Sequence, residues 1–265
     1  MILLTLLVCS FAALVLGKPN LGVVGGVDAV KGEFPYIVAQ LATNEGHVDL
    51  HCGGTIVAKS WFVTASHCVE IMSPLITANA GIIDLNENDV QQRRIVNYTI
   101  NPNYKRNPDL VGDIAVVKVE PPFEFNEFVQ PAKVPKRDAD PDLSKSVTLA
   151  GWGNVDDAGD QGNILQKVQL PLIKYDACMD IVRKWNPYNT YEYNHTEVCT
   201  GPISGGRGPC HGDSGGPLTQ DGVLIGVVSW GTNGCANIGS IALYAKVSSF
   251  INWIEDTIDE ELTFA

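Results

Sequence analysis

Short apolar runs recur along the chain and are separated by turn-forming residues, a pattern typical of strands rather than long helices. Valine and isoleucine are frequent in these runs, as packed strands require. Strands are predicted at Tyr36–Ala42, Gly54–Val63, Asp113–Val119, Ser146–Ala150, Ile164–Leu170 and Val223–Trp230. The segment Pro121–Asp142 contains five prolines and many charges. It is typical of a linker between two halves of similar size.

One segment near the carboxyl end departs from the strand pattern. A helix is predicted after a cap at Ser248 or Ser249, with a shared apolar face formed by Phe250, Ile251, Ile254 and Ile258. Acidic residues then gather at the end of this helix, where they oppose the helix dipole. We therefore expect the chain from about Glu260 to fray into a solvated tail. The alternative is an acidic tail that recognises a partner.

The amino-terminal segment Met1–Gly17 is apolar from Ile2 to Leu16. It is short for a membrane span, and Val15 and Gly17 suit the −3 and −1 positions of a signal-peptidase site. We interpret residues 1–17 as a secretory signal peptide, although the usual charged beginning is absent. An uncleaved anchor is the alternative. Because no other stretch could span a bilayer, we expect a secreted, extracellular protein without a membrane partner.

Composition supports a turn-rich fold. Of 265 residues, 45% are hydrophobic, and the chain has 26 glycines and 15 prolines. These values favour an all-β protein and exclude a disordered one. Lysine and arginine number 18 against 30 aspartates and glutamates, which gives a net charge of −12. Nucleic-acid binding is disfavoured, because it needs a basic surface.

Cysteine usage agrees with secretion. Cys9 lies in the signal peptide, and an even number remains: Cys52, Cys68, Cys178, Cys199, Cys210 and Cys235. Disulfides are expected in an oxidising compartment, although six cysteines allow 15 pairings. A zinc site is the alternative, but the cysteines are too widely spaced for it. Asn97 and Asn194 each begin a glycosylation sequon, whose occupancy the sequence leaves open.

Three segments carry residues suited to nucleophilic catalysis. Gly212–Pro217 places Ser214 among glycines that let backbone amides approach a substrate oxygen. Trp61–Cys68 ends an apolar strand with His67, and Asp113 opens a buried strand. Separately, each has a simpler interpretation as a glycine-rich turn, a structural histidine or a turn aspartate. Together they supply a nucleophile, a base and an orienting carboxylate.

At these motifs the chain resembles the trypsin–chymotrypsin family of serine proteases. The matching segments are Val23–Gly26, Thr64–Cys68, Gly112–Ala115, Gly212–Pro217 and Ser229–Gly231. Two residues depart from the usual pattern: Ser66 stands where alanine is common and Gly112 where asparagine is commoner. The resemblance implies two six-stranded antiparallel β-barrels packed face to face, with a C-terminal helix. It places the barrels in residues 23–130 and 131–265.

The resemblance also implies roles for individual residues. Ser214 would attack the scissile carbonyl, His67 would accept and return the proton, and Asp113 would orient His67. The backbone amides of Gly212 and Ser214 would form the oxyanion hole. The implied disulfides are Cys52–Cys68, Cys178–Cys199 and Cys210–Cys235.

Activation would follow cleavage of a propeptide, residues 18–22. In the resembled family the freed ammonium, here at Val23, pairs with the aspartate before the nucleophile, here Asp213. The bond to be cut, Gly22–Val23, lacks the usual arginine or lysine. A processing protease unlike trypsin is therefore implied.

Specificity is predicted from the pocket positions of the resemblance. Gly208 stands at the pocket base where trypsins have aspartate, Gly231 leaves the mouth open, and Ala242 adds no charge to the back wall. An unpaired buried lysine or arginine would be rejected, so cleavage after Phe, Tyr, Leu or Met is expected. Pro209 and Ala242 could narrow the pocket, which leaves an elastase- or collagenase-like preference for small aliphatic residues as the alternative. The remaining substrate-binding positions are Ser229 and Trp230.

We expect Arg207 to face solvent; turned inward, it would favour acidic substrates. No cofactor or metal is expected. Asp84, Glu87 and Asp89 lie near the loop that binds calcium in some relatives, but Ile82 and Ile83 disturb its beginning. The expected partners are protein or peptide substrates and an activating protease, and we expect a monomer. A secreted binding protein without catalysis is a further alternative.

Overall fold

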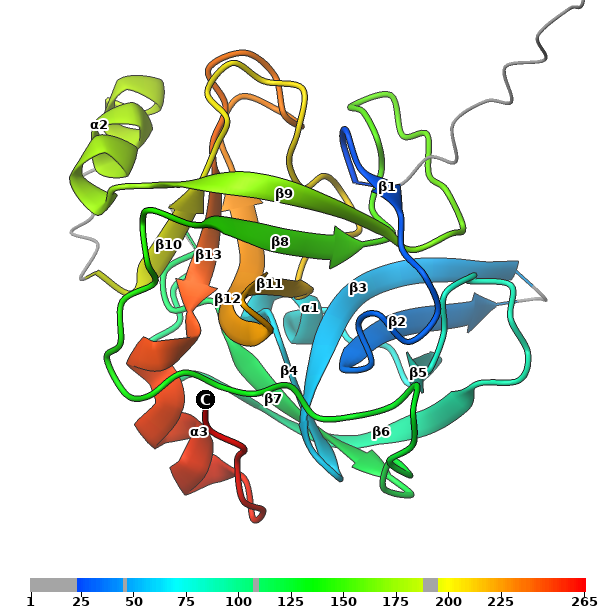
Figure 1. Ribbon diagram of the computed structural model, residues 1–265. Helices are drawn as coiled ribbons and strands as arrows, with labels where there is room; N and C mark the ends of the chain where they lie inside the picture. Colours follow the sequence, from blue (N-terminus) through cyan, green and yellow to red (C-terminus); the bar gives the residue numbers. More distant parts are fainter. Residues whose placement is uncertain (1–22, 45–46, 107–109, 188–194) are drawn as a thin grey trace, which may run out of the picture.

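The structure is a computed structural model that describes residues 23–44, 47–106, 110–187 and 195–265. The predicted signal peptide and propeptide, and Asn194, lie outside these residues. The described chain is built mostly of strands, which form two barrels side by side (Figure 1). Within the described chain, no helix has the length and apolar character needed to cross a membrane.

The first barrel is a closed antiparallel ring in the order β2-β3-β4-β7-β6-β5. Its strands are β2 (Ile37–Asn44), β3 (His47–Ala58), β4 (Trp61–Thr64), β5 (Ile76–Ala80), β6 (Gln91–Ile100) and β7 (Ala115–Glu120). The predicted strand Gly54–Val63 is wrong as a single element. The chain turns at Lys59 and Ser60, so that β3 and β4 pair as a hairpin.

The second barrel contains β8, β9, β10, β13, β12 and β11, and β8 closes it by pairing with both β9 and β11. The short strand β1 (Val27–Asp28) adds to the edge of β9, so the start of the described chain lies on the second barrel. The six strands are β8 (Ser146–Gly151), β9 (Gln166–Ile173), β10 (Glu197–Thr200), β11 (Pro217–Gln220), β12 (Val223–Gly231) and β13 (Ala242–Lys246). The predicted fold of two six-stranded barrels is confirmed.

In the part of the chain that the structure describes, three α-helices accompany the barrels: α1 (Ser66–Glu70), α2 (Tyr175–Trp185) and α3 (Ile251–Thr257). A 3₁₀ turn, η1 (Val247–Phe250), leads into α3, which is the predicted C-terminal helix. The sequence patterns did not predict α2. Its buried face is narrow, and a disulfide from Cys178 to Cys199 fixes it to β10.

Each barrel has its own apolar centre. Side chains such as Val38, Phe62 and Val117 fill the first, and Leu149, Leu218 and Tyr244 belong to the second. A further cluster joins residues of both barrels with α3. At the junction the backbones touch, since Gly53 N donates to Ser214 O at 2.8 Å. This close approach brings loops of both barrels together near Ser214.

The carboxyl-terminal segment, residues 258–265, is not the free tail that we expected. Asp259 accepts a hydrogen bond from Trp61 Nε1 at 2.7 Å and pairs with Lys118 at 2.8 Å. Val134 N donates to Thr263 O, and Ala265 N donates to Val134 O. The prediction treated the acidic residues only as opponents of the helix dipole, whereas at least Asp259 has partners on the first barrel.

Candidate active site

The three predicted catalytic residues come from both barrels. His67 lies in α1, directly after β4, and Asp113 lies just before β7, so both belong to the first barrel. Ser214 lies in the loop between β10 and β11 of the second barrel. The junction of the barrels therefore gathers residues that are far apart in the sequence.

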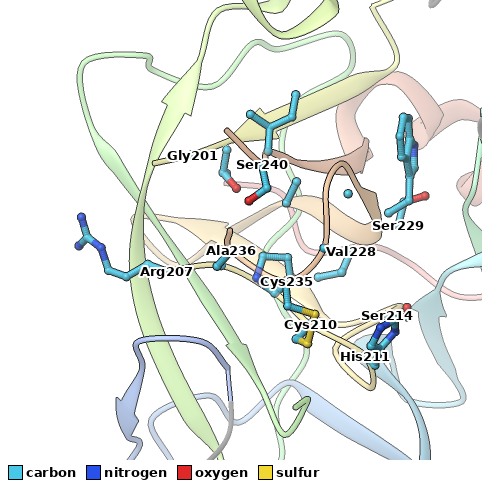
Figure 2. Close-up of a pocket in the computed structure, with 18 residues that line it drawn as sticks. Gly201, Arg207, Cys210, His211, Ser214, Val228, Ser229, Cys235, Ala236 and Ser240 are labelled. Atoms are coloured by element: carbon cyan, nitrogen blue, oxygen red, sulfur yellow. A yellow bond between two sulfur atoms is a disulfide. The ribbon is translucent and has the colours of Figure 1, made fainter. Parts of the chain in front are cut away.

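A cavity of about 310 Å³ opens beside Ser214. Its walls come from residues 200–211 and 228–242, and the disulfide Cys210–Cys235 joins these walls. Figure 2 shows Ser214 and His211 at one end of the cavity, and Gly201 and Ser240 toward the other. The predicted pocket residues Gly208, Pro209, Ser229, Trp230, Gly231 and Ala242 all line it.

No carboxylate lines this cavity within the described chain. Arg207 is exposed, and its side chain points away from the cavity, where Nη1 donates to Gln169 O at 3.3 Å (Figure 2). The cavity wall is therefore free of a fixed negative charge, and the arginine charge is held on its outer side.

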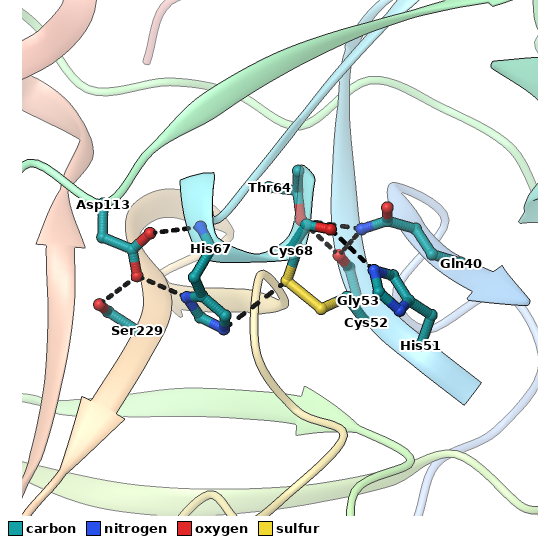
Figure 3. Close-up of a disulfide and its surroundings, with 9 residues drawn as sticks. All are labelled: Gln40, His51, Cys52, Gly53, Thr64, His67, Cys68, Asp113 and Ser229. Carbon is teal, nitrogen blue, oxygen red and sulfur yellow. Dashed lines mark hydrogen bonds and ion pairs between the residues drawn. A yellow bond between two sulfur atoms is a disulfide. The ribbon is translucent and has the colours of Figure 1, made fainter. Parts of the chain in front are cut away.

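His67 is fixed to Asp113 by two contacts, shown in Figure 3. Its backbone N donates to Asp113 Oδ1 at 2.9 Å, and its Nδ1 lies 2.7 Å from Asp113 Oδ2. Because an ionised carboxylate only accepts hydrogen bonds, Nδ1 is the donor in this contact, and Nε2 lies on the other side of the ring, 3.8 Å from Cys68 Sγ. Ser229 Oγ also donates to Asp113 Oδ2, at 2.5 Å. The buried carboxylate is thus satisfied on both oxygens.

The two residues that depart from the family pattern fit this arrangement. Ser66 is buried, and its Oγ donates to Ile114 O at 2.8 Å, which ties α1 to the chain beside Asp113. Gly112 has φ +63°, a conformation open to glycine and also visited by asparagine. Asn101 Nδ2 donates to Gly112 O at 2.9 Å and occupies the space of a Cβ atom there.

Ser214 lies at the cavity, but among the described residues no hydrogen bond joins it to His67. Its neighbours have committed backbone amides: Asp213 N donates to Cys210 O, and Gly215 N donates to Val228 O. By contrast, the amides of Gly212 and Ser214 have no acceptor in the described part of the chain. Two free N–H groups beside a serine can stabilise a negatively charged oxygen.

Val23 and Asp213 are both hydrogen-bonded to the backbone of Gly153. Val23 is buried, and its N donates to Gly153 O at 3.2 Å. Gly153 N in turn donates to Asp213 Oδ1 at 2.8 Å, and Cys210 N donates to Oδ2 at 2.9 Å. Complete burial raises the pKa of Asp213 to about 7, against the lowering effect of these two amides. A cation that arrived beside this carboxylate would relieve the cost of its burial.

Three disulfides are present: Cys52–Cys68, Cys178–Cys199 and Cys210–Cys235. Two groups of possible metal ligands occur among the described residues, around His67 and around His211. Their cysteine sulfurs belong to disulfides and are not thiolates. In the loop near residue 84, Glu87 accepts hydrogen bonds from Ile83 N and Asp84 N and pairs with Lys31.

Several residues that shape the cavity were not predicted from the sequence. Thr200, Ser240 and Ile241 line it, and Asp157 braces its rim by accepting a hydrogen bond from Cys235 N at 2.9 Å. The only available signal for Thr200 was its place one residue after Cys199, because the barrel pairing that brings it to the cavity is not local.

Comparison with known proteins agrees with this architecture. A protein-family model described as Trypsin matches residues 23–254. Trypsin-1 from Astacus astacus is 34% identical over 242 residues, which cover 88% of this chain and 98% of that protein. The venom peptide isomerase heavy chain from Agelenopsis aperta is 33% identical over 250 residues, with the same coverage of 88% and 98%. The chain therefore belongs to the trypsin family of serine endopeptidases.

Proposed function

We propose that this protein is a secreted endopeptidase that cleaves after large apolar or aromatic residues. The observation that carries the proposal is the cavity beside Ser214, which measures about 310 Å³ and has no carboxylate among its described lining residues. A dry cavity of about 150 Å³ is enough to bind benzene. The cavity thus has room for an aromatic side chain and offers no partner to a lysine or arginine.

The contact between His67 and Asp113 supports the following catalytic steps. Its Nε2 accepts the proton of Ser214 as the serine oxygen attacks the substrate carbonyl, and a tetrahedral intermediate forms. Asp113 holds Nδ1 and stabilises the imidazolium that results. The free amides of Gly212 and Ser214 receive the developing oxyanion. His67 then gives the proton to the leaving amine as the peptide C–N bond breaks, and the acyl-enzyme remains. Water, deprotonated by His67, attacks the acyl carbonyl, which releases the acid product and restores Ser214.

A preference for small aliphatic residues is the second candidate. Pro209 and Ala242 both line the cavity and carry side-chain atoms that a glycine would lack. Against strong narrowing stands the volume of about 310 Å³. The volume favours large side chains over small ones, because an underfilled apolar cavity forgoes packing contacts.

Activation and secretion complete the proposal. Cleavage of Gly22–Val23 would turn the buried Val23 amide into an ammonium close to Asp213. Signal-like residues 1–17 and three disulfides support an extracellular protein. Asn97 is exposed on β6, which makes its sequon accessible to glycosylation.

The test is a cleavage profile of the protein that begins at Val23, measured on a mixed peptide library. We expect cleavage after Phe, Tyr, Leu or Met, and none by the Ser214→Ala variant. Cleavage only after Ala or Val would support the elastase-like candidate, and cleavage after Lys or Arg would overturn the uncharged pocket. A protein with a confirmed Val23 terminus that cuts nothing would instead be a secreted binding protein.

A further inference from the structure

Two hydroxyl groups form a buried pair behind the cavity. Thr200 on β10 and Tyr244 on β13 are 1% and 0% exposed, and their oxygens lie 2.9 Å apart. The two strands pair with Thr200 opposite Ala242 and Val198 opposite Tyr244, so the two side chains are diagonal neighbours. Thr200 also lines the cavity.

The pair carries one hydroxyl proton that the hydrogen bond between its two oxygens does not use. Each hydroxyl carries one proton, and the bond between the two oxygens needs only one of them. Within the described chain, neither oxygen has a second hydrogen-bond partner. Burial raises the pKa of Tyr244 far above its usual range, so its phenol remains protonated. One buried hydroxyl proton is therefore without an acceptor among the described residues, and when Tyr244 donates to Thr200 it is the proton of the cavity-lining Thr200.

Of the pair, Thr200 lines the cavity, next in the chain to a residue at the end remote from Ser214. Thr200 directly precedes Gly201, which Figure 2 shows well away from Ser214. Apart from Ser214, the serine hydroxyls of the described wall already donate, since Ser229 donates to Asp113 and Ser240 donates to Asn237 O at 2.7 Å. Away from the mouth, Thr200 is thus the described lining side chain whose hydroxyl proton can be donated to a bound molecule.

We propose that Thr200 is a specificity-determining residue that favours tyrosine over phenylalanine before the cleaved bond. The spare hydroxyl proton of the Thr200–Tyr244 pair would be donated to the phenol oxygen of the substrate. A phenylalanine ring would fill the same space and leave that donor unpaired, which is costly in a buried site. This inference rests on the proposed function and refines its substrate class.

The test uses two peptides that differ only in tyrosine or phenylalanine before the scissile bond. Thr200→Val removes the hydroxyl and keeps the shape, in a strand that valine suits. We expect the ratio of kcat/KM for tyrosine over phenylalanine to fall about threefold to tenfold, as for loss of one hydrogen bond. Thr200→Ser keeps a hydroxyl and is expected to keep the ratio. Since both substrates meet the same enzyme sample, a partly folded variant does not alter it.

If the tyrosine-to-phenylalanine ratio of kcat/KM were the same in Thr200→Val as in the unmodified protein, the inference would be overturned. The proposed function would stand in that case, provided that both peptides are cut. A binding experiment separates the two ideas when neither peptide is cut. Phenol and toluene are titrated by calorimetry into the Ser214→Ala protein with and without Thr200→Val. We expect the threonine change to weaken phenol binding relative to toluene by a similar factor. An unchanged phenol-to-toluene preference would refute the role of Thr200 independently of catalysis.

Discussion

The carboxylate of Asp213 occupies space that only glycines leave open. A Cβ atom built on Gly153 would lie 2.4 Å from the Asp213 carboxyl carbon, and one on Gly151 would lie 2.1 Å from Oδ1. Neither glycine has a positive φ, so room rather than backbone freedom explains their presence. The position of the Asp213 side chain affects the predicted nucleophile, because Ser214 is the next residue in the chain.

Gly153→Ala should therefore displace Asp213 and disturb the adjacent oxyanion amides. We expect kcat to fall by about 100-fold or more, comparable with the loss of one oxyanion donor. The control is Gly222→Ala, where a Cβ meets no atom within 4 Å and φ is +79°. That change should lower stability without altering kcat. A Gly153→Ala enzyme with normal kcat would show that Asp213 can shift freely.

Glu197 is a second buried acid, outside the catalytic site. Its side chain is 8% exposed, Oε1 accepts from Thr196 Oγ1 at 2.8 Å, and Oε2 has no partner among the described residues. Desolvation raises its pKa to about 7, partly offset by Thr196 and Lys246. The native state thus prefers the neutral acid, and this preference has a consequence for stability.

The stabilising contribution of neutral Glu197 is complete below the unfolded pKa, near 4.5, and is lost as pH rises through about 7. Glu197→Gln remains neutral at every pH. Urea unfolding should show similar stability for both proteins at pH 4 and a gain on the order of 2 kcal/mol for the variant at pH 8. Glu261→Gln, at an exposed position, serves as the control. A gain that is the same at both pH values would argue against titration of Glu197.

At the scale of elements, residues 258–265 run along the first barrel and are called the strap. Residues 258–265 reach Trp61 and Lys118 through Asp259, and Ser60 N through Glu260. They also pair with the backbone of Val134 in the segment between the barrels. The strap thus joins α3, which follows the second barrel, to the first barrel.

Removal of residues 259–265 should therefore lower the melting temperature by several degrees, since the Trp61 and Val134 contacts are lost. Asp259→Asn tests the ionic part alone and should have a smaller effect, because the Lys118 pair is exposed. Differential scanning calorimetry measures both, with Glu261→Gln as the control. If the truncated protein melted with the full chain, the segment would be the solvated tail that its acidity first indicated.

Elements were predicted well from the sequence where a local run of apolar residues is enough to define them. Strands such as β2 and β12 contain mostly apolar runs. The motifs around His67, Asp113 and Ser214 can be recognised from a few consecutive residues of the sequence. Helix α2 was missed because only Cys178, Met179 and Val182 are buried on it and a disulfide holds it in place. Contacts between distant segments, such as Asp259 with Trp61 or Thr200 with Tyr244, depend on barrel closure and leave no local signal.

At the scale of the whole molecule, the predicted mature amino terminus at Val23 and the loop that carries Ser214 are coupled through the second barrel. Val23 packs in the apolar cluster of that barrel, and Val24 bridges Gly208 at the cavity wall. The same short stretch therefore contacts both Gly153, which binds Asp213, and the wall of the cavity beside Ser214. Its charge state depends on whether the Gly22–Val23 bond has been cut.

Two proteins, one beginning at Val23 and one at Gly22, isolate this effect. With the bond intact, Asp213 lacks a cation, and its pKa of about 7 means that its stabilising contribution is lost as pH rises from about 4 through 7. With Val23 free, the ammonium compensates the carboxylate. We expect the Val23 protein to be at least about 100-fold more active, since the oxyanion amides depend on Asp213. Its advantage in melting temperature should be larger at pH 8 than at pH 5, and Asp213→Asn should remove that pH dependence. Equal activity of the two proteins would show that the ion pair does not control the site.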